Sequence, residues 1–287
     1  MSGHSTRFAR AASFIAIVAG IGFASEANAA SFDVKIGTDF PLDPAEYGNC
    51  KCVSTAPSKD CTIRAAIQAS NMCSQPVDVI KLDDILPAVY RLSISGAGDD
   101  TGTIGDWDVF RDTANGGTTG SKTVYLNLNG QIITPDAGVV DRFFDIPATE
   151  TQLTLNISAG RLQNAQTAWP EKGGCLRARA GKLTLSSMVF QNCRAYHSGG
   201  AVEVSDVTLE VTNSNFGGNG FNVPLTYPHN PTGGALAARD STVTIEGSGF
   251  VDNSAQTGGG SSWRPTRLPG RFKEASPWPR AMSRPTS

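Results

Sequence analysis

The sequence has no apolar run long enough to cross a bilayer as a helix, which takes about 20 residues. Its longest candidate, residues 11–23, follows two arginines and precedes a small-x-small segment at 27–29. A basic start, a short apolar core and a small-x-small end are typical of a secretory signal peptide. We therefore predict a secreted protein, extracellular or associated with an outer membrane, with residues 1–29 as the signal, cleavage near Ala29 or Ala30, and no membrane span in the mature chain.

Histidine is scarce, and none lies near Cys50 and Cys52, whose spacing also differs from the C-x-x-C knuckle of metal sites. Zinc binding is therefore disfavoured. The even set of six cysteines instead favours disulfides in an exported protein. These cysteines are Cys50, Cys52, Cys61, Cys73, Cys175 and Cys193. The first four lie close together in sequence and are expected to pair among themselves, in one of three connectivities.

Clusters of positive charge are missing from most of the chain. Residues 30–260 carry 16 basic and 24 acidic side chains, whereas residues 261–287 carry six basic side chains and one acid. Nucleic-acid binding depends on basic patches that neutralise phosphates. The acidic composition of the body therefore disfavours a nucleic-acid partner.

The body does contain an internal repeat. Gly-Gly pairs begin at 173, 199, 233 and 258, and each of the first three is followed by apolar pairs at +3 and +5 and at +10 and +12. A phenylalanine follows at +17 in these three units, as Phe190, Phe216 and Phe250. An asparagine closes two of them at +20, as Asn219 and Asn253. So many coincidences at fixed offsets indicate a repeated structural unit.

This repeat predicts an all-β fold, a single-stranded right-handed parallel β-helix over residues 122–260. Apolar residues two apart mark short strands with one inward face, and a period near 25 residues is too short for a β-α-β unit, which needs about 30. Equivalent strands of successive coils are expected to pair in parallel, which stacks the phenylalanines and forms an amide ladder from the asparagines. The glycines are expected at the corners. The proline-rich residues 221–232 are predicted to form a loop inserted at one corner.

Two segments of the repeat resemble a known pattern. Residues 199–202 and 233–236 read G-G-A-V and G-G-A-L, and residues 216–219 and 250–253 read F-x-x-N. They are similar to the right-handed β-helix repeats of bacterial surface proteins of the polymorphic outer-membrane family, with G-G-A-[IL] and F-x-x-N signatures. The resemblance implies a surface or secreted passenger and implies no reaction.

Residues 30–121 are predicted to form an N-terminal cap over the first coil. Ile63, Ala66 and Ile67 follow the spacing of an amphipathic helix, and Asp60 is a plausible N-cap. Residues 61–67 resemble the CSLREA domain of exported bacterial β-helix proteins. The glutamate of that motif is replaced here by alanine, so the neighbouring arginine needs another partner. A short helix held by disulfides would cover the open end of the solenoid.

Four aspartates suggest a calcium site in a glycine-rich loop, because calcium prefers oxygen ligands. They are Asp99, Asp100, Asp106 and Asp108. Their spacing fits neither the EF-hand nor the nonapeptide repeat of calcium-binding β-helices, so solvated turn acids are the alternative. No other cofactor and no catalytic residue is assigned.

The sequence favours a binding or adhesin-like protein, with an extracellular glycan or a host or matrix surface as partner. A polysaccharide lyase or glycoside hydrolase on the same scaffold is the alternative, and a non-functional fragment of a longer β-helix protein is the second. Glu203 and Glu210 alternate with inward apolar residues and are expected to point outward, where they could as easily be solvating. No cluster of three acids with a nearby lysine or arginine is evident from the sequence.

The last 27 residues break the repeat. Residues 261–287 contain five prolines and neither valine nor isoleucine, so we expect a disordered tail that cannot pair as a parallel strand. We interpret it as the product of a truncation or frame shift, and the alternative is a genuine basic tail for an anionic surface. An uncapped last coil would tend to self-associate, although the oligomeric state cannot be read from the sequence.

Overall fold

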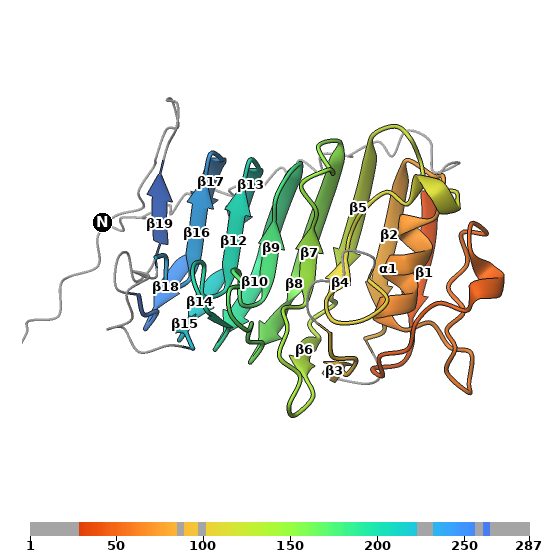
Figure 1. The fold of residues 1–287 in the computed structure, drawn as a ribbon, viewed down its shortest axis with the longest axis horizontal. Coiled ribbons are helices and arrows are strands. Elements are labelled where there is room, and N and C mark those ends of the chain that lie inside the picture. The colour runs from red at the N-terminus through yellow and green to blue at the C-terminus, as the bar shows by residue number, and fades with distance from the viewer. Residues whose placement is uncertain (1–28, 85–88, 97–101, 223–231, 256–260, 265–287) are drawn as a thin grey trace, which may run out of the picture.

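The computed structural model describes residues 29–84, 89–96, 102–222, 232–255 and, by its backbone, 261–264. Within these ranges the chain winds into stacked coils of short strands, and every ladder between strands is parallel (Figure 1). The architecture is that of a parallel β-helix, as the repeat predicts. One α-helix, α1 (Ile63–Asn71), lies beside the first strands. Two 3-10 turns, η2 (Pro44–Glu46) and η3 (Thr113–Asn115), lie in the loops.

The coils present three faces. The first face contains β1 (Ala29–Val34), β2 (Val77–Leu82), β5 (Lys122–Asn127), β8 (Leu153–Gln163), β10 (Lys182–Gln191), β13 (Thr208–Thr212) and β17 (Thr242–Glu246). The second contains β3 (Val89–Leu92), β6 (Ile132–Pro135), the second halves of β8 and β10, β14 (Asn215–Gly217) and β18 (Gly249–Val251). The third is a separate six-stranded sheet of β4 (Trp107–Asp108), β7 (Phe144–Ile146), β9 (Leu176–Ala178), β12 (Val202–Ser205), β16 (Leu236–Arg239) and β19 (Ser261–Arg264). The short strands β11 (Arg194–Ala195) and β15 (Gly220–Phe221) pair with each other before the third face.

The core between the faces follows the predicted register. Phe190, Phe216 and Phe250 form a continuous stack, with ring centroids 4.8 and 4.7 Å apart and ring planes within 4° of parallel. The Asn219 amide donates to Asn253 Oδ1 at 2.9 Å. Both the aromatic stack and the amide ladder are therefore confirmed, because identical positions of successive coils lie directly above one another.

The two glycines of each pair have different roles. Gly199 has a φ of +61° and makes the corner, as predicted. Gly200 does not need a positive φ. A Cβ there would lie 2.0 Å from the carbonyl oxygen of Gly234, so the second glycine is required where the corners of neighbouring coils approach each other.

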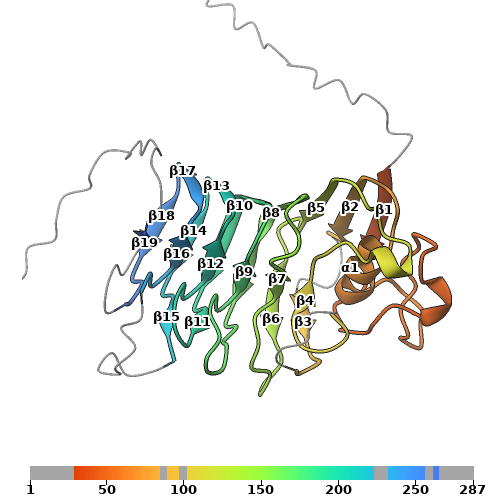
Figure 2. The same cartoon turned by 45° about the horizontal axis from the view of Figure 1, so that its top comes forward.

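Two disulfides cross-link the N-terminal region, as the sequence predicts. Cys50 bonds Cys73 and Cys52 bonds Cys61, so the first four cysteines do pair among themselves. A third disulfide, Cys175–Cys193, links the start of β9 to the end of β10 within one coil. The helix is buried along its whole length and packs against β1 and β2 at one end of the solenoid (Figure 2).

The helix start differs from the sequence prediction. Thr62, and not Asp60, is the N-cap, because its side chain accepts a hydrogen bond from the backbone N–H of Ala65. The carbonyl of Asp60 instead accepts a hydrogen bond from the Ser54 hydroxyl. Arg64, for which the sequence left the partner open, finds its carboxylate in Asp39, from the loop after β1.

The parallel ladders begin before residue 122. Strand β1 pairs with β2, and β2 pairs with β5, so the region assigned to the cap contributes strands to the same face as the repeat. Phe32 and Val34, then Ile80 and Leu82, alternate inward like the later strands. The one Gly-Gly pair of this region, Gly116-Gly117, precedes β5 and is not followed by a phenylalanine at +17.

The ladders also extend past residue 260. Strand β19 pairs in parallel with β16, so the expectation that nothing after Ser261 pairs as a strand was wrong for these four residues. The reason is local, because the first proline of the segment is Pro265. Residues 265–287, residues 1–28 of the predicted signal and most of the predicted corner loop, at 223–231, lie outside the described residues. No helix of the described part is long and apolar enough to cross a membrane.

Candidate functional site

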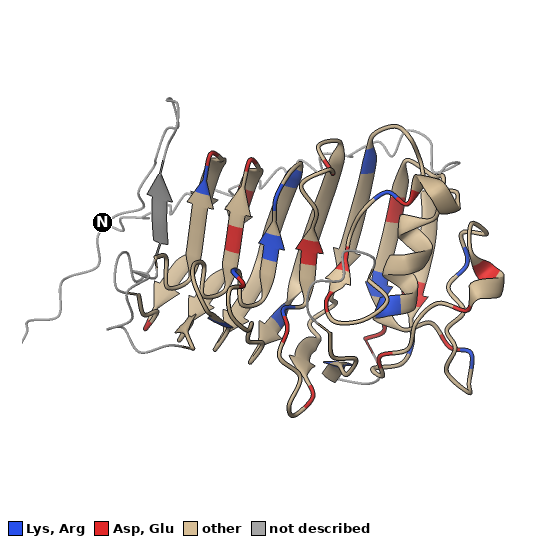
Figure 3. Cartoon of the chain, in the orientation of Figure 1, with Lys and Arg blue, Asp and Glu red and all other residues tan. Residues whose placement is uncertain are grey.

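The outer face of the six-stranded sheet carries a row of charged side chains, here termed the charged strip. Its members occupy the same register position on four neighbouring strands: Asp108 on β4, Asp145 on β7, Arg177 on β9 and Glu203 on β12. The residues on either side of each position on β7, β9 and β12 are fully buried apolar side chains, so the alternation of a strand sends the charged residue outward. Figure 3 shows the basic position on β9 between acidic positions on β7 and β12.

Asp145 is the centre of an arginine network. Its carboxylate accepts from Arg142 at 3.3 Å, from Arg177 at 2.5 Å and from Arg179 at 2.9 Å. Burial alone would raise the pKa of Asp145, but the hydrogen bond from Arg177 and the three positive charges outweigh it and hold the pKa below its usual value. Asp145 therefore stays ionised.

Glu171 connects this network to the corner before β9. It accepts from Arg177 at 2.7 Å and also bonds Arg142. The same corner carries Trp169, whose side chain is 64% exposed. Tyr196, from the equivalent corner of the next coil, meets Trp169 edge-to-face with centroids 6.5 Å apart, and its backbone N–H donates to the Glu171 carbonyl at 3.2 Å. Trp169, which is exposed, and Tyr196, which is partly buried, thus form an aromatic pair beside Glu171, which bonds Arg177 of the charged strip.

Two further aspartates, Asp106 and Asp141, contact Arg142, so the site contains more carboxyl groups than arginines. Burial raises the pKa of Asp106 to about 8, against the opposing charge of Arg142 at 3.1 Å. Burial likewise raises the pKa of Asp141 to about 6, although Arg142 and two backbone N–H groups favour its ionised form. Buried Asp106 therefore holds a proton near neutral pH, while Asp145 does not.

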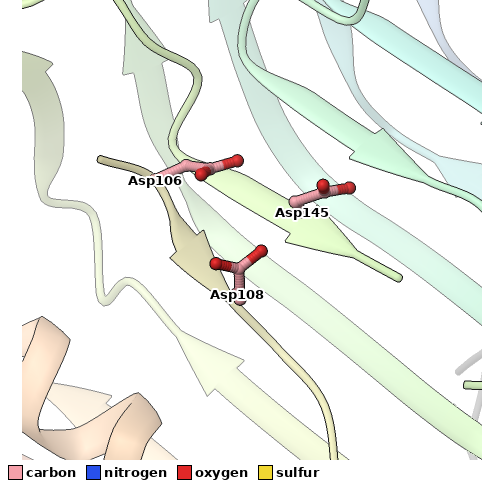
Figure 4. Close-up of side chains that lie close together, drawn as sticks. All are labelled: Asp106, Asp108 and Asp145. Carbon is pink, nitrogen blue, oxygen red and sulfur yellow. The ribbon is translucent and has the colours of Figure 1, made fainter. Parts of the chain in front are cut away.

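Three of these acids come together as a potential cation site. Asp106, Asp108 and Asp145 each offer a carboxylate oxygen within 4.8 Å of the others (Figure 4). The structure thus joins Asp106 and Asp108 of the predicted calcium set, whereas Asp99 and Asp100 lie outside the described residues. Arg142 already bonds both Asp106 and Asp145 and supplies positive charge there. Calcium binding stays a prediction.

The sequence missed the full cluster. No group of three acids with a nearby arginine is evident from the sequence, but in the structure Asp106, Asp108 and Asp145 lie close together and Arg142 bonds the first and the last of them. Asp145 sits in a three-residue strand, too short for its alternation to be recognised from the sequence. Only the parallel register of β4 with β7 brings it beside Asp108.

Glu203 lies on the outer face as predicted, but it is not solvated. Only 5% of its surface is exposed. Burial raises the pKa of its carboxyl, with Lys172 and Arg177 the leading opposing charges. Glu210, on the first face, is half exposed and pairs with Lys182 at 2.9 Å.

Raising the pH from 5 to 8 is expected to destabilise the protein through Asp106. Because burial raises its pKa from 3.8 to about 8, the folded state keeps a proton that the unfolded chain loses. This contribution is fully present below about pH 4 and is lost as the pH rises through about 8, by at most ~1.4 kcal/mol per pH unit for one proton. Asp106→Asn should flatten the decline, measured by urea unfolding at pH 5, 6.5 and 8. Asp136→Asn is the control, because Asp136 is exposed. If the free energy of unfolding of D106N falls with pH as steeply as that of the wild type, Asp106 is not the source of the decline.

No family model, curated protein or solved structure matches this chain. The function must therefore follow from the charged strip and the aromatic pair. These features offer hydrogen-bond donors, acceptors and an exposed apolar ring surface along one rigid face.

Proposed function

We propose that the protein is an exported right-handed parallel β-helix, of the capped surface-protein type that its repeat and N-terminal segment resemble, and that it binds an extracellular glycan along the charged strip. The right hand follows from the strong preference of parallel strand connections for that hand. The three disulfides indicate an oxidising, extracytoplasmic location. The exposed Trp169 beside the charged strip carries the proposal.

The aromatic pair has the properties of a sugar-binding platform. Tryptophan and tyrosine combine a large apolar ring surface with a polar group, and the apolar faces of sugar rings pack on such surfaces. Trp169 leaves most of its indole uncovered, while Tyr196 supports its edge. Ligand sites combine such apolar surfaces with a few placed polar groups, which Glu171 and Arg177 supply nearby.

The segment that carries Trp169 is held in place. Glu171 N–H donates to the Ala168 carbonyl, and the Glu171 carbonyl accepts from Tyr196. The Glu171 side chain is fixed by Arg177. A binding surface that is already ordered loses little conformational entropy when a ligand arrives.

The dimensions of the charged strip suit a chain-like ligand. Its four positions lie on adjacent parallel strands, which are about 4.8 Å apart, so the strip extends over about 14 Å. Asp108, Asp145 and Glu203 are almost fully buried, so a polymer lying across the strands would contact the strip through the partly exposed side chains of Arg177 and Glu171. The rigid, repeated scaffold therefore favours an oligosaccharide over a single sugar.

Trp169→Ala is expected to weaken glycan binding at least about 10-fold, which corresponds to ~1.4 kcal/mol, because the stacking surface is lost. A glycan array screened with the purified mature protein would select the ligand, and calorimetry would compare the variants. Tyr125→Ala is the matched control, because Tyr125 is an exposed aromatic on β5 of the first face. Absence of any bound glycan, or equal affinity of W169A and wild type, would refute the proposal.

Glycan cleavage is the second candidate, and the acid pair Asp106 and Asp145 favours it. Their pKa values are displaced in opposite directions, as in pairs that divide acid and base roles. Both side chains are nevertheless almost fully buried and bonded to Arg142, whereas Trp169 is exposed, so binding at Trp169 is the first candidate. Shorter products released from the bound glycan during the same assay would favour cleavage.

A further inference from the structure

A groove lies away from the charged strip, where the first face of the solenoid bends into the second. Strands β8 and β10 cross this bend without a break, and each has one residue of positive φ there, Ala159 at +55° and Ser187 at +54°. The groove has a volume of about 380 Å³ and spans three successive coils, from Gly130 to Val189. A Cβ on Gly130 would meet no atom within 4 Å, so the space over this residue is open. Sites for small ligands occupy roughly 300–1,000 Å³, so the groove is large enough to hold one.

Arg161 lies in this groove between two aliphatic side chains. It is in register with Ile132 of β6 on one side and with Val189 of β10 on the other, and all three line the groove. They are partly exposed, whereas the residues that follow the first two, Ile133 and Leu162, are buried in the core. The groove therefore presents one cation flanked by apolar surface.

The charge of Arg161 has no counter-charge on this face. The described strands of the second face contain no acidic residue. Their other arginine, Arg91 on β3, pairs with Asp136 at 3.2 Å. Arg161 forms no ion pair within the described part of the chain. An anionic ligand would therefore find a cation in the groove that no carboxylate of these strands already neutralises.

The side chains around Arg161 favour an anion carried by a partly apolar, partly hydroxylated body. A guanidinium presents a planar fork that donates two parallel hydrogen bonds to one carboxylate. Gln163 and Gln191 lie two residues further along β8 and β10, in register with each other. Their amides can both donate hydrogen bonds to hydroxyl groups and accept them. A carboxylate, apolar C–H faces and hydroxyl groups occur together in an acidic sugar residue of the uronic-acid type.

An acidic peptide also carries carboxylates, but the groove does not suit the addition of a peptide strand. Extended peptides bind in this way by pairing with a free strand edge. Around Arg161, β8 is already paired with β6 on one side and with β10 on the other. A ligand in the groove therefore meets side chains and not free backbone groups, which favours a sugar chain over a peptide.

We propose that the groove at Arg161 binds an acidic sugar residue, with Arg161 pairing with its carboxylate and with Ile132 and Val189 contacting the C–H groups of its ring. Gln163 and Gln191 would bind hydroxyl groups of the same chain. The site lies at a different corner of the coil from Trp169, so it does not depend on the glycan binding proposed there. It adds a second ligand class, an anionic one.

Arg161→Gln tests the pairing, because it removes the charge and keeps a polar side chain. We expect its affinity for a uronic-acid oligosaccharide, measured by calorimetry on the purified protein, to fall at least about 10-fold, as expected for the loss of a hydrogen bond between charged groups. Its melting temperature should match that of the wild type, since no ion pair within the described residues is broken. Arg161→Lys keeps the charge and loses the fork, so it should bind with intermediate affinity, and it replaces R161Q if that variant does not fold.

Arg91→Gln is the matched control, because it makes the same change on the same face at an arginine that is already paired. The ligands are uronic-acid, sulfated and neutral oligosaccharides of equal length and a polyglutamate peptide. Binding of the uronic-acid chain that R161Q weakens and R91Q leaves unchanged supports the inference. If R161Q binds this chain as the wild type does, if the sulfated chain or the peptide binds more tightly, or if no acidic chain binds, the inference fails. W169A, measured with the same ligands, decides the glycan binding proposed at Trp169 separately.

Discussion

Replacing Arg64 with methionine is expected to lower the free energy of unfolding by about 3–5 kcal/mol, the effect of removing one partner of a buried ion pair. The Arg64 side chain is fully buried on α1 and donates to both oxygens of Asp39, at 2.7 and 2.8 Å. It also donates to the carbonyls of Gly102 and Gly105 at 2.9 and 2.7 Å. Methionine fills much of the same volume but leaves the Asp39 carboxylate and both carbonyls without this donor.

Chemical unfolding followed by circular dichroism would measure this loss. Arg91→Met is the matched control, because Arg91 forms an exposed ion pair with Asp136 at 3.2 Å. Exposed pairs contribute no more than about 1 kcal/mol. If R64M and R91M unfold at the same denaturant concentration, the Arg64–Asp39 pair does not hold the cap on the solenoid.

Replacing Phe216 with alanine is expected to cost about 3–5 kcal/mol, as for other buried phenylalanines. Phe216 is 1% exposed and stacks on both sides, against Phe190 and Phe250. Its removal leaves a cavity in the middle of the aromatic stack. The coils around this cavity cannot close it, because their spacing is fixed by the ladders on all three faces.

Phe250→Ala provides a control of the same chemistry in the last described coil. Phe250 is only partly buried and stacks on one neighbour, so its replacement should cost less than half as much. Thermal and urea unfolding of both variants would give the two values. Equal losses for F216A and F250A would mean that the stack is not the main source of the stability of the core.

The part of the fold that the sequence predicts best is the part where coils are alike. Phe190 and Phe216 occur at one offset from paired glycines, and a solenoid places equal offsets at equal positions, so their contact follows directly. The first coils lack this offset, because their one Gly-Gly pair, Gly116-Gly117, has Ile133 and not a phenylalanine at +17. Phe32 and Ile80 pair in register, but an alternation of two apolar residues is too common to place their strands in one ladder from sequence alone.

The candidate site was harder to predict because its groups come from irregular coils. Asp106 and Asp108 were identified because they are close in sequence. Asp145 and Arg177 enter the site through the registers β4–β7 and β7–β9, which no local pattern reveals. The burial of Glu203 could not be predicted either, since alternation indicates which way a side chain points and not what covers it.

The disulfides make the two ends of the solenoid unequally resistant to unwinding under force. The hydrogen bonds between coils run along the solenoid axis, so a force pulling on its two ends loads one coil at a time. Within the described residues, the last strands β17 and β18 are bonded on one side only, whereas the opposite end is tied by Cys50–Cys73 and Cys52–Cys61. Unwinding under tension would therefore start at the last coils and release them in sequence. It would be arrested at the coil that Cys175–Cys193 closes, which cannot extend while that bond is intact.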